Sequence, residues 1–126
     1  MILPTAATLR VFHDAQLRRF GGAPGLRDPG LFESALGRVE SALLYAPMDA
    51  VDAAAMLCHA ILKNHAFVDG NKRTAYGGLV MTLAGNGLRL AAEDDAILAM
   101  ILAAAAGSGP WQAIAAWLRP RVVAAA

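Results

Sequence analysis

The segment from residue 65 to residue 74, His-Ala-Phe-Val-Asp-Gly-Asn-Lys-Arg-Thr, gathers side chains that could handle phosphate. Lys72 and Arg73 follow a break in helical spacing at Gly70, so they fall in the first turn of the helix that begins there. A helix N-terminus already carries roughly half a positive charge, and each cation in that turn is disfavoured by some tenths of a kcal/mol. The sequence therefore predicts an anion at this helix end, where free backbone N–H groups commonly hold phosphate.

The same segment supplies the other groups that phosphoryl or nucleotidyl transfer needs. His65 closes the preceding helical pattern and could act as a general base near neutral pH. Asp69 precedes the predicted phosphate site and is the natural ligand for a Mg²⁺ ion that bridges phosphate oxygens. Gly70 allows the turn and a close approach to the ligand, and we expect Asn71 to cap the helix and to bind an anion or an ion-bound water. We interpret Phe67 as the apolar side chain that fixes the turn to the core.

Each of these residues alone has a simpler explanation. A lone histidine is more often structural than catalytic, a Lys-Arg pair is usually a solvated surface, and Asp-Gly-Asn is usually a plain turn. A polar corner without function would have to gather all of them in one turn by chance and also misplace its charges. The phosphate-binding loop of nucleotide hydrolases is excluded, because it needs a preceding strand and a second glycine at a fixed spacing.

The elements that must position this segment are predicted to be helices. Apolar residues recur at helical spacing along nearly the whole chain, and no stretch gives a convincing strand, since only residues 88–90 alternate. An alanine-rich composition with eight aromatic side chains favours closely packed helices over strands. We therefore expect an all-α fold, a compact single-domain helical bundle of about six helices that comprises residues 1–126.

Capping residues, glycines and prolines set the expected limits of these helices. Thr5 caps the first helix, Gly21 ends it, Asp28 caps the second helix with Pro29 at its first position, and Pro47 closes that helix. One face of the first helix is expected to contain Leu9, Phe12, Gln16 and Phe20. A third helix that starts at Asp49 or Asp52 is apolar nearly all round and should be central. The remaining helices are expected within residues 71–86, 93–107 and 108–120.

Charge, hydropathy and cysteine content exclude several classes of protein. The net charge of +1 gives no reason to expect nucleic acid or an anionic membrane as a partner. The longest apolar run, residues 96–106, has eleven residues, whereas about twenty are needed to cross a bilayer. The N-terminus lacks the features of a secretory signal, so we expect a cytoplasmic protein. Cys58 is the single cysteine, which excludes an intramolecular disulfide, and we interpret it as a small core residue.

The motif segment resembles the signature of the Fic/Doc superfamily, and in particular of its Doc branch, the death on curing toxins. His65-x-Phe67-x-Asp69-Gly70-Asn71-Lys72-Arg73 is similar to the Fic pattern His-Pro-Phe-x-(Asp/Glu)-Gly-Asn-Gly-Arg. The chain has Lys72 where Fic enzymes have their second glycine, as Doc proteins do, and Ala66 replaces the proline. Other segments that look like Doc-type sequence are residues 13–16, 20–28, 33–36, 64–65 and 86–87.

This resemblance implies the toxin of a bacterial toxin–antitoxin pair, with a Fic-type fold and a separate Phd-like antitoxin, since no stretch looks like a built-in inhibitory helix. Doc-like toxins look like kinases that transfer the γ-phosphate of ATP to a threonine of elongation factor Tu and so block translation. By this likeness His65 is the base on the acceptor hydroxyl and Asp69 the Mg²⁺ ligand. The residues that would hold phosphates are Gly70, Asn71, Lys72 and Arg73, with Lys63 as a further contact.

Several alternatives stay open at this point. Fic enzymes usually transfer AMP rather than phosphate, and the kinase interpretation depends mainly on Lys72, whose side chain would fill part of the nucleotide cradle and reverse the bound ATP. A catalytically inactive module that only binds an antitoxin is a second alternative. The loop of residues 21–28 is either a flap that positions the target or a plain connection, and Gly77 and Gly78 serve either close helix packing or ligand clearance. We expect His13 and His59 to be structural.

Overall fold

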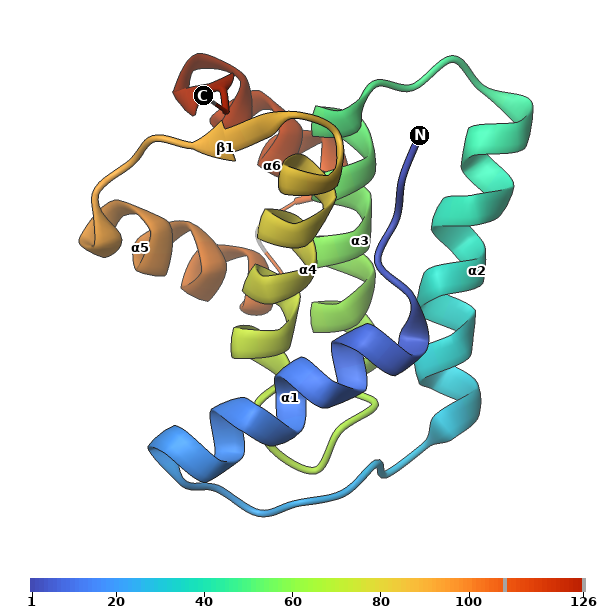
Figure 1. Cartoon of the computed structure of the whole chain (residues 1–126), viewed down its shortest axis with the longest axis vertical. Coiled ribbons are helices and arrows are strands. Elements are labelled where there is room, and N and C mark those ends of the chain that lie inside the picture. Colours follow the sequence, from blue (N-terminus) through green and yellow to red (C-terminus); the bar gives the residue numbers. More distant parts are fainter. Residues whose placement is uncertain (108, 126) are drawn as a thin grey trace.

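The computed structural model describes residues 1–107 and 109–125, and within them it contains six α-helices and two short strands (Figure 1). The all-α prediction is confirmed. The expected start of the last helix at Ser108 lies outside the described residues. The elements are α1 (Ala6–Phe20), α2 (Pro29–Tyr45), α3 (Ala50–Asn64), α4 (Asn71–Gly85), β1 (Leu88–Leu90), α5 (Asp94–Ala105), α6 (Trp111–Leu118), a 3₁₀ turn (Arg119–Arg121) and β2 (Val122–Ala124).

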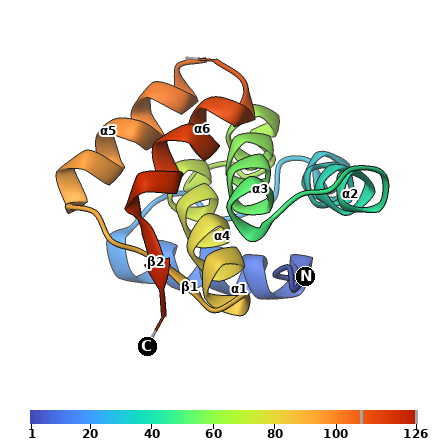
Figure 2. The ribbon, with the colours of Figure 1, turned by 90° about the horizontal axis from the view of Figure 1, so that it is seen from above.

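Helix α3 is the centre of the molecule, as its sequence predicted. Eleven of its fifteen residues are buried, and many of them are alanines, which let neighbouring helices approach closely. Helix α2 packs on one side of α3, and α4 and α6 pack on the other (Figures 1 and 2). The C-terminal end of α3 leads directly into the motif segment, so the site stands on the most deeply buried helix of the fold.

The predicted cap residues lie where the sequence placed them. The hydroxyl of Thr5 accepts a hydrogen bond from the N–H of Thr8, and the carboxylate of Asp28 accepts one from Leu31. Asp49 and Asp52 share the start of α3, because each carboxylate accepts from the backbone N–H of the other. These interactions are local, which explains why the helix starts could be predicted.

The buried face of α1 differs from the expected one. Leu9, His13 and Leu17 are buried, whereas Phe20 is 56% exposed. The predicted face of Leu9, Phe12, Gln16 and Phe20 is therefore wrong for Phe20, whereas Phe12 and Gln16 are half-buried and the ring of Phe12 packs against Gly77 of α4. Apolar periodicity does not predict the buried face of α1, because a polar residue, His13, lies in the middle of that face.

The two strands were not expected. Strand β1 pairs antiparallel with β2, with Leu88 opposite Ala124 and Leu90 opposite Val122. Leu88, Leu90 and Val122 pack against the core. Three residues are too few to show a period of two, and the partner strand lies more than thirty positions away in the sequence, so no local pattern revealed the pair.

The glycines in the middle of α4 allow close helix packing. A Cβ atom on Gly77 would lie 2.3 Å from the ring of Phe12 in α1, and one on Gly78 would lie 3.2 Å from Ile61 and 3.3 Å from Leu57 in α3. Helix packing thus accounts for both glycines without ligand clearance.

The apolar run of residues 96–106 forms most of α5. Met100 and Ile101 are buried, whereas Leu98 and Leu102 remain about half exposed. None of the helices in the described part of the chain combines the length and apolarity needed to cross a membrane.

Candidate active site

The motif segment forms a tight turn between α3 and α4 that two unusual backbone conformations make possible. His65 ends α3 in the left-handed region with φ of 48°, and it is the one non-glycine residue with positive φ in the described chain. Gly70 stands at the N-cap of α4 with φ of 81°, a conformation that glycine adopts at no steric cost. The left-handed backbone of His65 costs about 1 kcal/mol or more, so the fold holds this residue where its unaided preference would not.

A cavity of about 320 Å³ opens beside this turn and is lined by seven residues of the motif. These residues are His65, Val68, Asp69, Gly70, Asn71, Lys72 and Arg73. The structure thus brings together the predicted base, the predicted metal ligand and four predicted phosphate-binding residues. Lys63 does not line this cavity; it lines a neighbouring one, which His65 also lines.

The start of α4 has free backbone donors. No side chain in the described part of the chain caps this helix, and no acidic residue stands in its first turn. The N–H groups of this turn therefore lack the side-chain partners that helix starts usually have. Lys72 and Arg73 add two exposed cations at the same end. This arrangement suits an anion such as a phosphate group.

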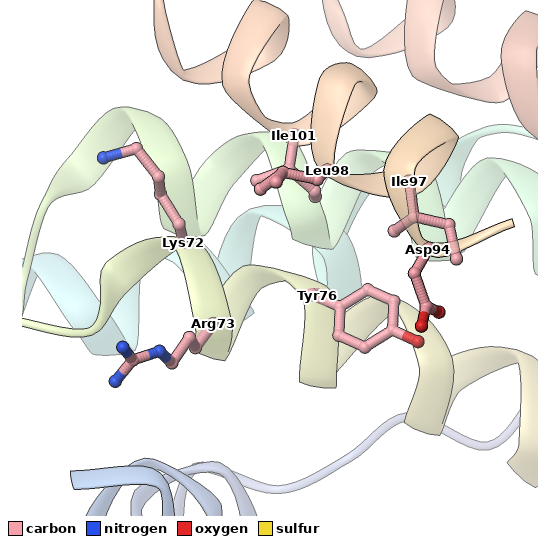
Figure 3. A pocket seen from close by; sticks show the side chains of 7 residues that line it. All are labelled: Lys72, Arg73, Tyr76, Asp94, Ile97, Leu98 and Ile101. Atoms are coloured by element: carbon pink, nitrogen blue, oxygen red, sulfur yellow. The ribbon is translucent and has the colours of Figure 1, made fainter. Parts of the chain in front are cut away.

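Lys72 and Arg73 extend in different directions from the first turn of α4 (Figure 3). The guanidinium of Arg73 lies 5.1 Å from the ring centroid of Phe20, and it donates a long hydrogen bond of 3.4 Å to the carbonyl of Gly21. Both cations also line a groove between α4 and α5, together with apolar residues of α5 and with Tyr76 and Asp94 at its far end (Figure 3). Lys72 thus lines both the cavity beside the motif turn and this groove.

Asp69 has a carboxylate that is exposed at the cavity and held by backbone donors. Its Oδ1 accepts a hydrogen bond of 2.8 Å from the N–H of Gly70, and its Oδ2 accepts a longer one of 3.4 Å from Ala23. Each oxygen keeps a free lone pair. Magnesium ions commonly take one or two carboxylates and fill the other positions with phosphate oxygens and water, so a single carboxylate fits this metal. Among the described residues there is no cluster of three or more side chains that could hold a metal without such help.

Asn71 does not cap α4 as expected, because it is the first residue of the helix and Gly70 occupies the cap position. Its side chain, 7% exposed, turns back to the motif turn instead. The amide oxygen accepts from the N–H of Phe67 at 3.1 Å, and the amide nitrogen donates to the carbonyl of Phe67 at 2.9 Å. Asn71 therefore braces the turn with its side chain, and its backbone N–H is the group that could meet a ligand.

Phe67 lies in the core, 1% exposed, with its ring edge against Phe32 at a centroid distance of 5.0 Å. On its other side it stacks on His13 of α1, with ring centroids 3.8 Å apart. Sequence reasoning assigned His13 a structural role without connecting it to the motif. The spacing could have indicated this contact, because His13 lies four residues from both Leu9 and Leu17 and therefore on the same helix face.

The loop of residues 21–28 pairs with the motif turn along its backbone. Leu26 forms an antiparallel bridge with Phe67, and the N–H of Val68 donates to the carbonyl of Gly25 at 3.1 Å. The N–H of Arg27 donates to the carbonyl of Ala66 at 2.7 Å, and its guanidinium donates to the carbonyl of His65. The loop is therefore more than a connection, since it holds the turn that carries His65. Sequence reasoning missed Arg27 because a glycine-rich loop gives no periodic signal.

Burial is the main cause of the pKa shifts of two other titratable groups near the site, His59 and Cys58. Desolvation lowers the pKa of His59, with a hydrogen bond to the backbone of Gly109 as an opposing effect and nearby Lys63 and Arg38 as weaker lowering effects. Burial raises the pKa of the Cys58 thiol to about 12, so the thiol is protonated at neutral pH. Cys58 is fully buried, which confirms that it is a core residue rather than a nucleophile.

The helical fold and the motif turn together define the class of protein. Residues 4–82 match the Fic/DOC family, and the chain therefore belongs to that family, as its sequence predicted. It is 37% identical over 83 residues to a protein of Escherichia phage P1 named protein kinase doc. It is 44% identical over 80 residues to a protein of Mycolicibacterium smegmatis named toxin Doc.

These two matches cover 65% and 60% of this chain, and 66% and 60% of the respective relatives. The chain therefore matches less than two thirds of the length of either protein. The similarity includes the motif turn, since the family match ends at residue 82 within α4.

Proposed function

We propose that the chain is the toxin of a bacterial toxin–antitoxin module, and that it transfers the γ-phosphate of ATP to a threonine of elongation factor Tu and so blocks translation. The observation that carries this proposal is one cavity that combines an exposed histidine, a backbone-held carboxylate and an uncapped helix start with two cations. Similarity to proteins named protein kinase doc and toxin Doc supports the class of reaction and the role of toxin. A Phd-like antitoxin is the proposed partner.

In this proposal the imidazole of His65 takes the proton of the threonine hydroxyl as the oxygen attacks the γ-phosphorus of ATP. A new bond forms between that oxygen and phosphorus, the bond from phosphorus to the bridging oxygen breaks, and ADP leaves with the electron pair. His65 is exposed at the mouth of the cavity, so a hydroxyl on another protein can reach it. The backbone N–H groups at the start of α4, with Lys72 and Arg73, stabilise the negative charge on the phosphate oxygens.

Asp69 is the proposed ligand of a Mg²⁺ ion, since it is the acidic side chain that lines the cavity. When bound, the ion would neutralise charge on the phosphate oxygens of ATP. The hydrogen bond from Gly70 to Oδ1 orients the carboxylate for this task, and both oxygens keep lone pairs for a cation.

Lys72 is the residue on which transfer of phosphate rather than AMP depends. Its side chain lines the cavity at a position where a glycine would leave open space. When the Lys72 side chain fills this part of the cavity, ATP binds with its γ-phosphate toward the acceptor hydroxyl. With a glycine at this position, the open space accommodates the inner phosphates instead. AMP transfer is the competing reaction, because the Fic/DOC family includes enzymes that transfer AMP.

The test is incubation of the purified chain with elongation factor Tu and ATP labelled at either the α or the γ position, in separate reactions. We expect label on the factor from γ-labelled ATP alone, and none with the His65→Ala variant. His59→Ala is the matched control, a second histidine of α3 that lies outside the motif cavity. Label retained from the α position would establish AMP transfer instead.

Growth arrest on expression provides the second arm of this test. We expect arrest with the chain itself, relief with His65→Ala, and relief when the proposed Phd-like antitoxin is expressed together with the chain. Arrest that persists with His65→Ala would contradict a catalytic toxin and support a module that acts by binding alone.

A further inference from the structure

His13 is a buried polar residue whose side chain meets the motif turn but does not line its cavity. It lies on the buried face of α1 and is 2% exposed. An imidazole without hydrogen-bond partners would be costly at such a site. The ring has a close polar partner, since Nε2 lies 2.6 Å from the carbonyl oxygen of Asp69, while Nδ1 lies 3.4 Å from Oδ1 of Asp14.

The short contact with Asp69 fixes which nitrogen carries hydrogen. A backbone carbonyl oxygen can only accept, so Nε2 of His13 must be the donor. The bond joins α1 to a residue 56 positions later in the chain. It therefore links the first helix directly to the residue that we propose as the metal ligand.

The peptide unit between Asp69 and Gly70 is held at both of its polar ends. Its carbonyl accepts from His13, and its N–H donates to Oδ1 of the Asp69 carboxylate at 2.8 Å. A rotation of this peptide plane would break both hydrogen bonds at once. The orientation of the Asp69 carboxylate thus depends on the contact with His13.

Two packing contacts reinforce this arrangement. The ring of His13 stacks on Phe67 with an interplanar angle of 20°, and a Cβ atom on Gly70 would lie 3.2 Å from Cδ2 of His13. His13 therefore contacts the motif turn at Phe67 and Asp69, and it leaves little room for a side chain at position 70. Asp69 and Gly70 line the cavity, whereas His13 does not.

We propose that His13 is a positioning residue for phosphoryl transfer, which acts by fixing the Asp69–Gly70 peptide so that the carboxylate and the start of α4 face the phosphates. This proposal rests on the proposed function. It goes beyond it by assigning a role to a residue outside the motif that would touch neither nucleotide nor target.

Two substitutions separate the hydrogen bond from the stacking contact. His13→Gln keeps an N–H donor at a similar distance from the backbone and loses the aromatic ring. His13→Phe keeps a ring against Phe67 and loses the donor. Leu9→Ala is the matched control, because Leu9 is buried on the same face of α1 one turn earlier and should destabilise the fold without touching the Asp69–Gly70 peptide.

The activity readout is transfer of label from α- or γ-labelled ATP, measured at a series of Mg²⁺ concentrations. We expect His13→Phe to lower kcat about tenfold or more, a loss typical of misplaced catalytic groups, and to raise the Mg²⁺ concentration needed for half-maximal rate. His13→Gln should stay within about threefold of the unsubstituted chain, well inside that loss. Leu9→Ala should lower thermal stability and leave the Mg²⁺ requirement unchanged.

The second readout does not depend on activity. Hydrogen exchange at the amide of Gly70 should become faster in His13→Phe, because release of the peptide exposes this N–H, and should stay slow in His13→Gln and Leu9→Ala. Unchanged exchange at the Gly70 amide in His13→Phe would overturn the claim that His13 holds the Asp69–Gly70 peptide. Faster exchange with unchanged kcat and Mg²⁺ requirement would show a structural role only and overturn the positioning role. If the unsubstituted chain transferred neither label, the proposed function and the catalytic part of this proposal would both fail. Exchange at Gly70 would still decide whether His13 holds the Asp69–Gly70 peptide.

Discussion

Two helices of equal length, α3 and α4, begin in opposite ways. At the start of α3, Asp49 and Asp52 cap each other's N–H groups, and the guanidinium of Arg119 lies 2.8 Å from Asp49 and 2.6 Å from Asp52. At the start of α4 stands Gly70, with no side-chain cap. Two cations, Lys72 and Arg73, occupy the turn in which α3 has an acid.

The difference separates a helix start with complementary charge, at α3, from one suited to an anion, at α4. Acidic side chains at a helix N-terminus complement its partial positive charge and typically stabilise it by about 0.3–1 kcal/mol. Cations at that end are disfavoured by a similar amount until an anion arrives. The start of α4 therefore gives up local stability that the start of α3 keeps, and this is expected of a phosphate site.

The largest expected effect comes from removing His65, the proposed base beside α4. His65→Ala should reduce phosphate transfer to elongation factor Tu by about 100-fold or more, the usual contribution of general base catalysis. The melting temperature should change little, because the imidazole is exposed. Rates from γ-labelled ATP and a thermal melt of the same sample provide the measurement, and a loss of activity of less than about threefold would exclude His65 as the base.

The next effect concerns Lys72, which we propose determines whether phosphate or AMP is transferred. Lys72→Gly should lower γ-phosphate transfer by about tenfold or more, because one of the charges that stabilise the transferred group is lost. The opened cradle should also allow AMP transfer to appear. Parallel reactions with α- and γ-labelled ATP measure both. Unchanged γ-transfer in Lys72→Gly would remove the basis for preferring a kinase over an AMP transferase.

On the other side of the comparison, Asp49→Ala should lower the free energy of unfolding by about 1 kcal/mol through loss of the helix cap. Urea unfolding followed by circular dichroism measures this change. Phosphate transfer should be unaffected, since Asp49 lies at the far end of α3 from the motif turn (Figure 1). A matching loss of activity would show that the two helix starts are not independent.

The same residue makes a smaller, pH-dependent contribution. Hydrogen bonding from the Arg119 guanidinium is the main effect that holds the pKa of Asp49 below its usual value, with burial as a partial opposing effect. A carboxyl whose pKa is lowered in the folded state stabilises the fold above its unfolded pKa and loses that contribution as the pH falls, here from roughly pH 4 downwards. Asp49→Asn retains a capping side chain but does not titrate, so its unfolding free energy should fall less steeply in this range. Identical pH profiles for the two proteins would contradict the assignment.

The smallest expected effect comes from replacing a cation at the start of α4 with an acid. Lys72→Glu should stabilise the ligand-free protein by about 0.5 kcal/mol, because an acid then faces the helix dipole. The same change should abolish the stabilisation that ATP and Mg²⁺ give in a thermal shift assay. A variant that is less stable without ligand would argue against unfavourable charge at this end. Arg38→Glu, an exposed change of the same sign and size on α2, controls for net charge.

The parts of this account that the sequence could predict are those with local causes. Thr5, Asp28 and Asp49 each cap a helix through a neighbour three residues away, and the cluster of His65, Asp69 and the two cations lies within nine positions. Such interactions are written into short segments, so spacing and residue type were enough to locate them.

The parts that the sequence did not predict depend on contacts between distant segments. His13 meets Asp69 across 56 positions, and Arg27 meets His65 across 38. Neither residue differs by type from an ordinary surface or loop residue, and their roles appear only when α1 and the following loop pack against the motif turn. The capping role expected of Asn71 was wrong for a related reason, because its amide satisfies the backbone of Phe67 instead.

The central claim, that the start of α4 is a phosphate site and the start of α3 is not, can be tested directly with isotope-labelled protein. Titration with ATP and Mg²⁺ should shift the backbone amide resonances of residues 70–73 progressively and leave those of residues 50–52 in place. Inorganic phosphate should shift the same amides more weakly. Amides at the start of α4 that do not move, or that move no more than those at the start of α3, would contradict the account.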